Sequence, residues 1–179
     1  MNAIFPLLAL ALGGCGVGRE PDPARADRGA ATPGPDFASA AFSCCAHDGV
    51  RAAILAYTEV QEALARDDAA DALAGLPLLQ RQAQAAAGDP ALPAGVAALV
   101  RALGELAATP ARSDLDGLRA AFPALSEKAV VLAQADRGGS KKLAVAFCPQ
   151  SNAIWLQASP QVQNPYLGAL GAGSGAFRP

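Results

Sequence analysis

The sequence predicts a mainly α fold: an antiparallel four-helix bundle followed by a short strand and an irregular C-terminal segment. Aromatic residues make up 5% of the 179 residues, and the apolar residues are mostly Ala, Leu and Val. This composition favours helices, because Ala and Leu lose little freedom in a helix and Ala packs poorly on a sheet. Four stretches also repeat apolar residues every three or four positions. Four amphipathic helices with short connections pack most simply as an antiparallel bundle.

The four helices are predicted over about 50–66, 68–87, 93–107 and 114–137. Pro77 predicts a kink or a break near Gly75, because proline removes a helical hydrogen bond. The fourth helix is the best defined, since Ser113 and Asp114 offer an N-cap and Gly138 ends the apolar repeat. Residues 143–147 are predicted to form the short strand.

The N-terminal residues predict the compartment. Residues 3–14 are an uncharged apolar run that ends in Gly13-Gly14-Cys15. The run is shorter than the roughly 20 residues that span a bilayer, but it fits the core of a signal peptide. It resembles a bacterial lipoprotein signal, in which residues 1–14 are removed and Cys15 is diacylated. This resemblance implies a lipid-anchored protein of the bacterial cell envelope that faces the periplasm. Gly16 after the cysteine favours the outer membrane. The alternative is a secretory signal that is cut elsewhere.

Composition divides the rest of the chain. Residues 15–41 are rich in Pro, Gly and mixed charge, and they predict a disordered tether behind the lipidated cysteine. A helical domain is expected over 42–175, with a tail at 176–179. The net charge is −2 and the basic residues are scattered, so a nucleic-acid partner is not expected. We also do not expect an enzyme, because no paired carboxylates, catalytic triad or phosphate loop is present.

The segment Cys44-Cys45-Ala46-His47 holds two of the four cysteines and the only histidine. Three interpretations remain open. Cys44 or Cys45 forms a disulfide with Cys148, which an oxidising periplasm permits. Alternatively, Cys44, Cys45 and His47 bind a soft or borderline ion, alone or with Cys148. In the third interpretation the segment binds nothing and leads into a helix that starts near His47.

The C-terminal segment carries a more specific pattern. The order Cys-Pro, Trp-Leu-Gln and Asn-Pro-Tyr-x-Gly follows a helix with the pattern Arg-x-x-Phe-x-x-x-Ser. The residues of this pattern are Arg119, Phe122, Ser126, Cys148, Pro149, Trp155, Asn164, Pro165, Tyr166 and Gly168. The pattern resembles a bacterial family of unknown function. Members are stand-alone periplasmic or lipid-anchored proteins, or are fused to the periplasmic adaptor subunits of copper/silver-type efflux pumps.

The resemblance implies a role near heavy-metal efflux, but this chain departs from the family pattern at its soft ligands. Gln150, Gly171 and Ser174 stand where the family has sulfur-containing residues. We therefore expect a structural or interaction module of the envelope whose partner is an efflux-pump component or another envelope protein. The alternative is an accessory protein that binds Cu(I), Ag(I) or Zn. Its ligands would be Cys148 together with Cys44, Cys45 or His47.

Overall fold

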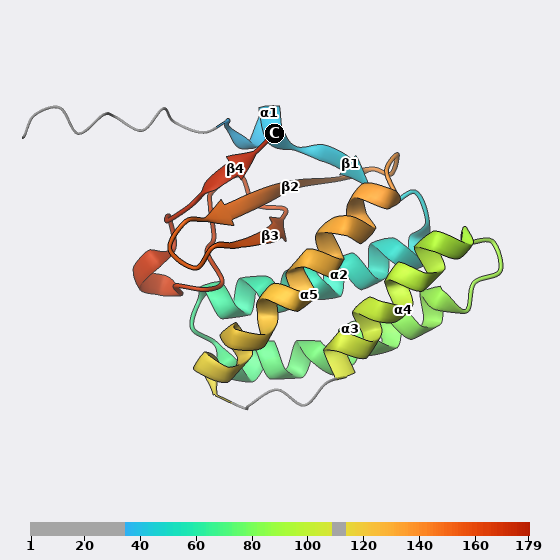
Figure 1. The fold of residues 1–179 in the computed structure, drawn as a ribbon, viewed down its shortest axis with the longest axis horizontal. Coiled ribbons are helices and arrows are strands. Elements are labelled where there is room, and N and C mark those ends of the chain that lie inside the picture. The colour runs from blue at the N-terminus through green and yellow to red at the C-terminus, as the bar shows by residue number, and fades with distance from the viewer. Residues whose placement is uncertain (1–34, 109–113) are drawn as a thin grey trace, which may run out of the picture. The chain divides into compact units, whose positions relative to one another are not determined.

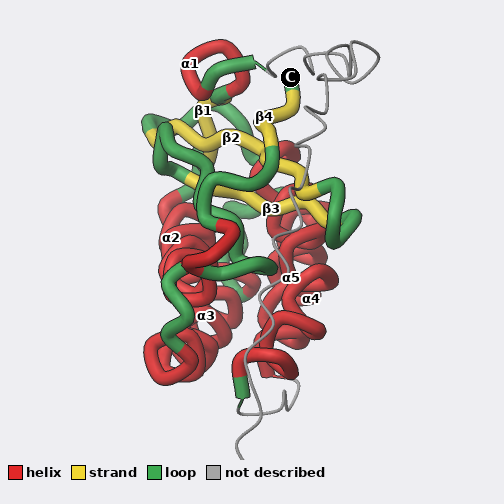
Figure 2. The backbone as a smooth tube through the Cα atoms, turned by 90° about the vertical axis from the view of Figure 1, so that its left-hand side faces the viewer, coloured by secondary structure: helices red, strands yellow, loops and turns green. Residues whose placement is uncertain are grey.

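The computed structural model describes residues 35–108 and 114–179, which form a mainly helical fold with a small antiparallel sheet (Figure 1). The elements are α1 (Phe37–Ala40), β1 (Phe42–Cys44), α2 (Asp48–Ala65), α3 (Ala69–Ala87), α4 (Ala94–Ala108), α5 (Leu115–Ala135), β2 (Lys141–Cys148), β3 (Ala153–Gln157), η2 (Ala169–Gly171) and β4 (Ala176–Arg178). In Figure 2 the strands gather on one side of the four long helices. The predicted mainly helical class is confirmed, whereas the sheet is larger than one short strand.

The long helices lie close to their predicted positions because each has an apolar face that its neighbours cover. Consecutive long helices contact one another, and α2 also contacts α5. The predicted stripe of α2 is buried at its full length, with every side chain at most 1% exposed: Val50, Ile54, Tyr57, Gln61 and Leu64. At the start of α5 the carboxylate of Asp114 accepts a hydrogen bond from the N–H of Gly117 at 2.7 Å, so the predicted cap is present.

Of the kink or break that Pro77 predicts near Gly75, the break is wrong, because α3 continues through Pro77. At this point α3 lies very close to α2: a Cβ on Gly75 would be 2.7 Å from Cγ2 of Val60. The missing side chain lets the two helices approach, and their packing offsets the hydrogen bond that proline removes. The packing of α3 on α2 therefore outweighs the tendency of Pro77 to break the helix.

The sheet is built around β2, which pairs antiparallel with β1, β3 and β4. Phe42 of β1 lies opposite Leu143, while Ala146 lies between Trp155 of β3 and Phe177 of β4. The sequence analysis found only the middle of β2. Its partners β1 and β4 are three residues long, too short to show the alternation that marks a strand.

Both ends of the described chain belong to the fold, so the predicted boundaries after residues 41 and 175 need correction. Residues 37–40 of the expected tether form α1, and residues 176–178 of the expected tail form β4. The rings of Phe37 and Phe177 pack edge to face at 5.5 Å between centroids, which holds the two ends side by side. The predicted signal peptide (1–14) and Cys15 lie outside the described residues. Within the described ranges, no helix is both long and apolar enough to cross a membrane.

Gly139 provides a test of how the double-cysteine segment packs against the turn before β2. A Cβ at this position would collide with the carbonyl oxygens of Cys44 and Cys45. We expect Gly139→Ala to lower the free energy of unfolding by about 2 kcal/mol or more, because backbone must move. Urea unfolding followed by circular dichroism measures the change.

The matched control is Gly95→Ala in α4, where an added Cβ meets nothing within 4 Å. Alanine loses less backbone entropy than glycine in a helix, so this variant should gain up to about 1 kcal/mol. A Gly139→Ala protein as stable as the parent would contradict the described packing.

Candidate functional site

The double cysteine forms a disulfide between neighbouring residues rather than two separate thiols. Cys44 and Cys45 are bonded to each other, and both are fully buried. Cys45 has a φ of 72°, a left-handed conformation that few residues other than glycine adopt. In this state neither sulfur is a thiolate, so neither can bind a soft metal ion.

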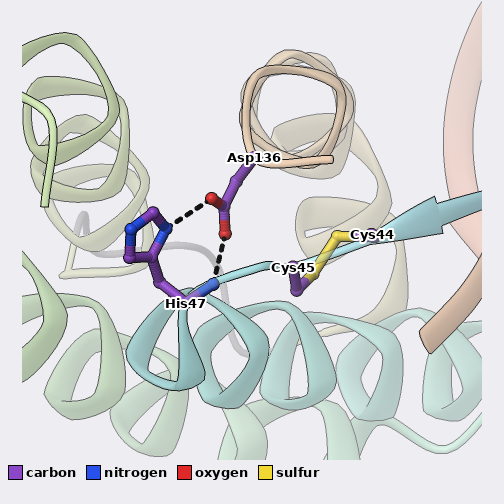
Figure 3. The surroundings of a disulfide bond; sticks show 4 residues. All are labelled: Cys44, Cys45, His47 and Asp136. Carbon is purple, nitrogen blue, oxygen red and sulfur yellow. Dashed lines mark hydrogen bonds and ion pairs between the residues drawn. A yellow bond between two sulfur atoms is a disulfide. The ribbon is translucent and has the colours of Figure 1, made fainter. Parts of the chain in front are cut away.

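Asp136, the residue after α5, holds this segment in place (Figure 3). Its backbone carbonyl accepts hydrogen bonds from the N–H groups of Cys45 at 2.6 Å and Ala46 at 3.2 Å. Its carboxylate accepts one from the backbone N–H of His47 at 3.2 Å and lies 2.6 Å from Nδ1 of the imidazole. Asp136 is only 3% exposed. One buried residue therefore satisfies four groups, which fixes the start of α2 against the end of α5.

His47 is the N-cap residue of α2, as the third interpretation of this segment predicted. Its imidazole and the disulfide point in different directions from the chain in Figure 3. With Nδ1 at Asp136 and both neighbouring sulfurs in the disulfide, His47 does not form a ligand set with Cys44 and Cys45.

Cys148 is a free, buried thiol at the opposite end of β2 from the disulfide. Cys44 pairs with Lys141, and Cys148 is seven residues further along the strand. At about 3.4 Å per residue, Cys148 lies about 24 Å along β2 from Lys141, the residue beside Cys44. A disulfide needs Cα atoms within about 7 Å. The predicted bridge from Cys148 to Cys44 or Cys45 is therefore wrong, and the predicted metal site that combines these residues is not formed. Among the described residues, no three His, Cys, Asp or Glu side chains are grouped to hold a metal ion.

Cys148 lies in a polar environment that favours its thiolate. Burial alone would raise the pKa of the thiol. Hydrogen bonds from the side chains of Ser151 and Asn164 and from the backbone N–H groups of Gln150 and Ser151 more than offset this effect, and the pKa of Cys148 lies below its ordinary value. Pro149 starts the turn that leads from this cysteine into β3.

The aromatic residues of the C-terminal pattern meet at one place, where α2, α5 and β3 come together. Tyr57 stacks on Phe122 with 5.4 Å between ring centroids. The ring centroid of Tyr166 lies 5.9 Å from that of Phe122 and 5.9 Å from that of Trp155. Trp155 is fully buried and belongs to the hydrophobic core, which confirms that the tryptophan is a core residue. These rings join the C-terminal segment to the helical core.

The polar groups of this aromatic cluster are used in internal hydrogen bonds. The hydroxyl of Tyr57 lies 2.8 Å from Oγ of Ser126 and accepts a bond from the N–H of Leu156 at 3.3 Å. The hydroxyl of Tyr166 donates to the carbonyl of Ile154 at 2.7 Å. Burial raises the pKa of both tyrosines well above the ordinary value, so both stay protonated at neutral pH. Ser126 thus has a structural partner in Tyr57.

Arg119 ties the C-terminal segment to the loop between α2 and α3. Its guanidinium donates to the carbonyl of Pro165 at 3.0 Å, to the carbonyl of Leu64 at 2.8 Å and to the carboxylate of Asp67. The same carboxylate accepts the backbone N–H of Ala169 at 3.1 Å. The hydrogen bond from Arg119 lowers the pKa of Asp67 most, with further contributions from Ala169 and from the positive charge of Arg119.

Gly168 and Asn164 shape the same segment. Gly168 has a φ of 61°, and a Cβ there would collide with Asp67 and Arg119. The buried side chain of Asn164 donates to the carbonyl of Ser174 at 2.8 Å and accepts the N–H groups of Tyr166 and Leu167 at 2.9 and 3.2 Å. The pattern residues therefore form one internal network, which the resemblance alone did not predict.

The sequence analysis missed three residues of these networks. Tyr57 lies on the predicted stripe of α2, but periodicity does not show a hydroxyl partner. Asp67 follows α2 with a φ of 63°, and Asp136 follows α5. Asp67 directly follows the predicted helix 50–66, a signal that could have identified it, whereas Asp136 lies inside the predicted helix 114–137 and gave no such signal. In comparisons with family models, curated proteins and solved structures, the chain has no significant match.

The disulfide pairing predicts a specific thiol count. With Cys15→Ser, the full chain keeps Cys44, Cys45 and Cys148. Denatured without reductant, it should show one reactive thiol per chain, and three after reduction. Adding Cys148→Ser should remove the single thiol, because the other two cysteines are bonded to each other. A peptide map that links Cys148 to another cysteine would overturn the assignment.

The Asp67–Arg119 ion pair predicts a loss of stability in acid. Because the folded pKa of Asp67 lies below its ordinary value of 3.8, its contribution is complete above that value and is lost as the pH falls through the lower folded pKa. Asp67→Asn should therefore reduce the fall in the free energy of unfolding between pH 5 and pH 3, measured with urea. Arg119→Gln should reduce the same fall. If both variants keep the parent's pH dependence, the pair does not stabilise the fold.

Proposed function

We propose that this protein is a lipid-anchored structural or interaction module of the bacterial cell envelope that faces the periplasm and docks a protein partner. The proposed anchor is a diacyl group on Cys15, exposed when residues 1–14 are removed. The run of small residues before Cys15 supports this step. We propose further that α2 to α5 act as an antiparallel four-helix bundle that presents a stable surface to the partner.

The observation that carries this proposal is the internal network around Tyr166. Arg119, Ser126 and Asn164 are polar groups that could act in chemistry, but each is engaged in internal hydrogen bonds. Arg119 joins α5 to the carbonyl of Pro165. Ser126 joins α5 to Tyr57 of α2, and Asn164 bonds within the C-terminal segment. Such a network is typical of residues whose task is to keep a shape. A fixed shape lowers the entropy cost of binding a partner.

The resemblance to domains fused to heavy-metal efflux adaptors suggests the class of partner. We propose a periplasmic component of such a pump. The soft-metal alternative required Cys148 beside Cys44, Cys45 or His47, and the length of β2 separates them. Docking to a partner does not require these residues to bind one metal ion, so we favour it over the soft-metal alternative.

Two measurements test the proposal. In a bacterial host, membrane fractionation should find the full chain with the membrane and Cys15→Ser in the soluble periplasmic fraction. A Cys15→Ser protein that stays with the membrane would refute the lipid anchor.

The second measurement is co-purification of the tagged full chain with the periplasmic adaptor of a heavy-metal efflux pump from the same genome. Binding should be unchanged in Cys148→Ala and after chelator treatment. In contrast, Arg119→Gln should weaken binding, because it removes hydrogen bonds that hold the C-terminal segment in place. Circular dichroism checks that each variant is folded. Absence of binding by the parent, or binding only with metal and intact Cys148, would overturn the proposed role.

A further inference from the structure

A pocket of about 220 Å³ lies beside the sheet, between α1, the end of α5 and β4, and none of the networks described above uses it. Its walls include Ser39, Phe42, Gln134, Arg137, Val145 and Arg178. Two of these side chains are arginines from distant parts of the chain: Arg137 follows α5 and Arg178 ends β4. The fold therefore brings two guanidinium groups to one small cavity.

Each arginine is held over an aromatic ring. The guanidinium carbon of Arg137 lies 4.9 Å from the centroid of Phe42, and that of Arg178 lies 3.9 Å from the centroid of Phe147. Phe42 pairs with Leu143, and Leu143, Val145 and Phe147 alternate along β2, so both rings belong to the same face of the sheet. A guanidinium that stacks on a ring keeps its in-plane N–H groups available for another partner.

Neither guanidinium has an acidic partner within the described residues. Arg51, Arg66 and Arg119 each form an ion pair with an aspartate, whereas the guanidinium groups of Arg137 and Arg178 form no ion pair or hydrogen bond there. The carboxylate of Pro179 lies at the same pocket and forms no ion pair with either arginine, so two positive charges face one negative charge there. This arrangement favours a ligand that carries negative charge.

We propose that this pocket binds the phosphate group of a phosphoester. Two planar guanidinium groups can donate paired hydrogen bonds to phosphate oxygens, and the amide of Gln134 and the hydroxyl of Ser39 supply neutral donors at the same pocket. Phe42 and Val145 add an apolar wall, which suits the carbon substituent of an ester better than a free ion.

The phosphoester has two possible sources, a phospholipid headgroup and a soluble metabolite. The lipid source rests on the proposed function, because a diacylated Cys15 would hold the protein near a bilayer. Ser39 and Phe42 lie in the first part of the described chain, so this face is the one nearest in sequence to that anchor.

The first experiment measures binding of sn-glycerol 3-phosphate to the full chain carrying Cys15→Ser, by titration calorimetry at low salt. We expect saturable binding, weakened about tenfold by Arg137→Gln or by Arg178→Gln, because each change removes charge-assisted hydrogen bonds. The double variant should show no saturable binding. The matched control is Arg81→Gln, an exposed arginine on α3, which should bind like the parent. Fluorescence of the buried Trp155 checks folding.

The second experiment uses sedimentation with vesicles of phosphatidylglycerol or of phosphatidylcholine. A lower bound fraction for the double variant than for the parent, on phosphatidylglycerol, assigns the pocket to lipid headgroups. Binding of glycerol phosphate with no such difference on vesicles assigns it to a soluble phosphoester. If neither ligand distinguishes the parent from the double variant, the proposal is overturned. Because Cys15 is replaced throughout, the result does not depend on the lipid anchor.

Discussion

The arrangement of this protein depends on the pairing of β2 with three other strands. One edge of β2 pairs with β1 and β4, and the other edge pairs with β3, so the first and last described strands lie along the same strand. The length of β2 then sets the positions of the cysteines. Cys44 is fixed at its start and Cys148 at its end. A strand of eight residues keeps Cys148 far from Cys44 and Cys45, and this constraint excludes both a disulfide and a shared metal site that would combine Cys148 with them.

Two aspartates join the sheet side of the molecule to the helices. Asp136 binds the segment before α2, while Asp67 binds Arg119 and the backbone N–H of Ala169. Each aspartate follows a long helix and bonds to residues that are far away in the sequence. The helical core and the C-terminal segment are therefore one cooperative structure rather than a bundle with an appended tail. This view fits a protein that presents a fixed surface to a partner, as we propose.

The residues of the C-terminal pattern are held together by packing and by internal hydrogen bonds. Phe122, Trp155 and Tyr166 supply apolar area, and Asn164 and Gly168 shape the backbone around them. Cys148, the one unpaired thiol within residues 35–108 and 114–179, lies beside the same cluster. The proposed phosphate pocket is a separate feature, formed where Arg137 and Arg178 stack on rings of the sheet. The aromatic cluster that fixes the C-terminal segment and the two arginines of the proposed phosphate pocket thus lie in different parts of the fold.

The sequence by itself determined the four long helices, because helical periodicity and caps such as Asp114 are local properties. It also predicted Trp155 as a core residue, and one of three open interpretations placed a helix start near His47. Only the tertiary structure decided the bonding state of Cys44, Cys45 and Cys148, the continuity of α3 through Pro77, and the strands β1 and β4. These features depend on contacts between residues that are distant in sequence, such as Cys44 with Lys141. No local pattern encodes such contacts, because the register of a sheet and the approach of two helices are set by packing of the whole chain.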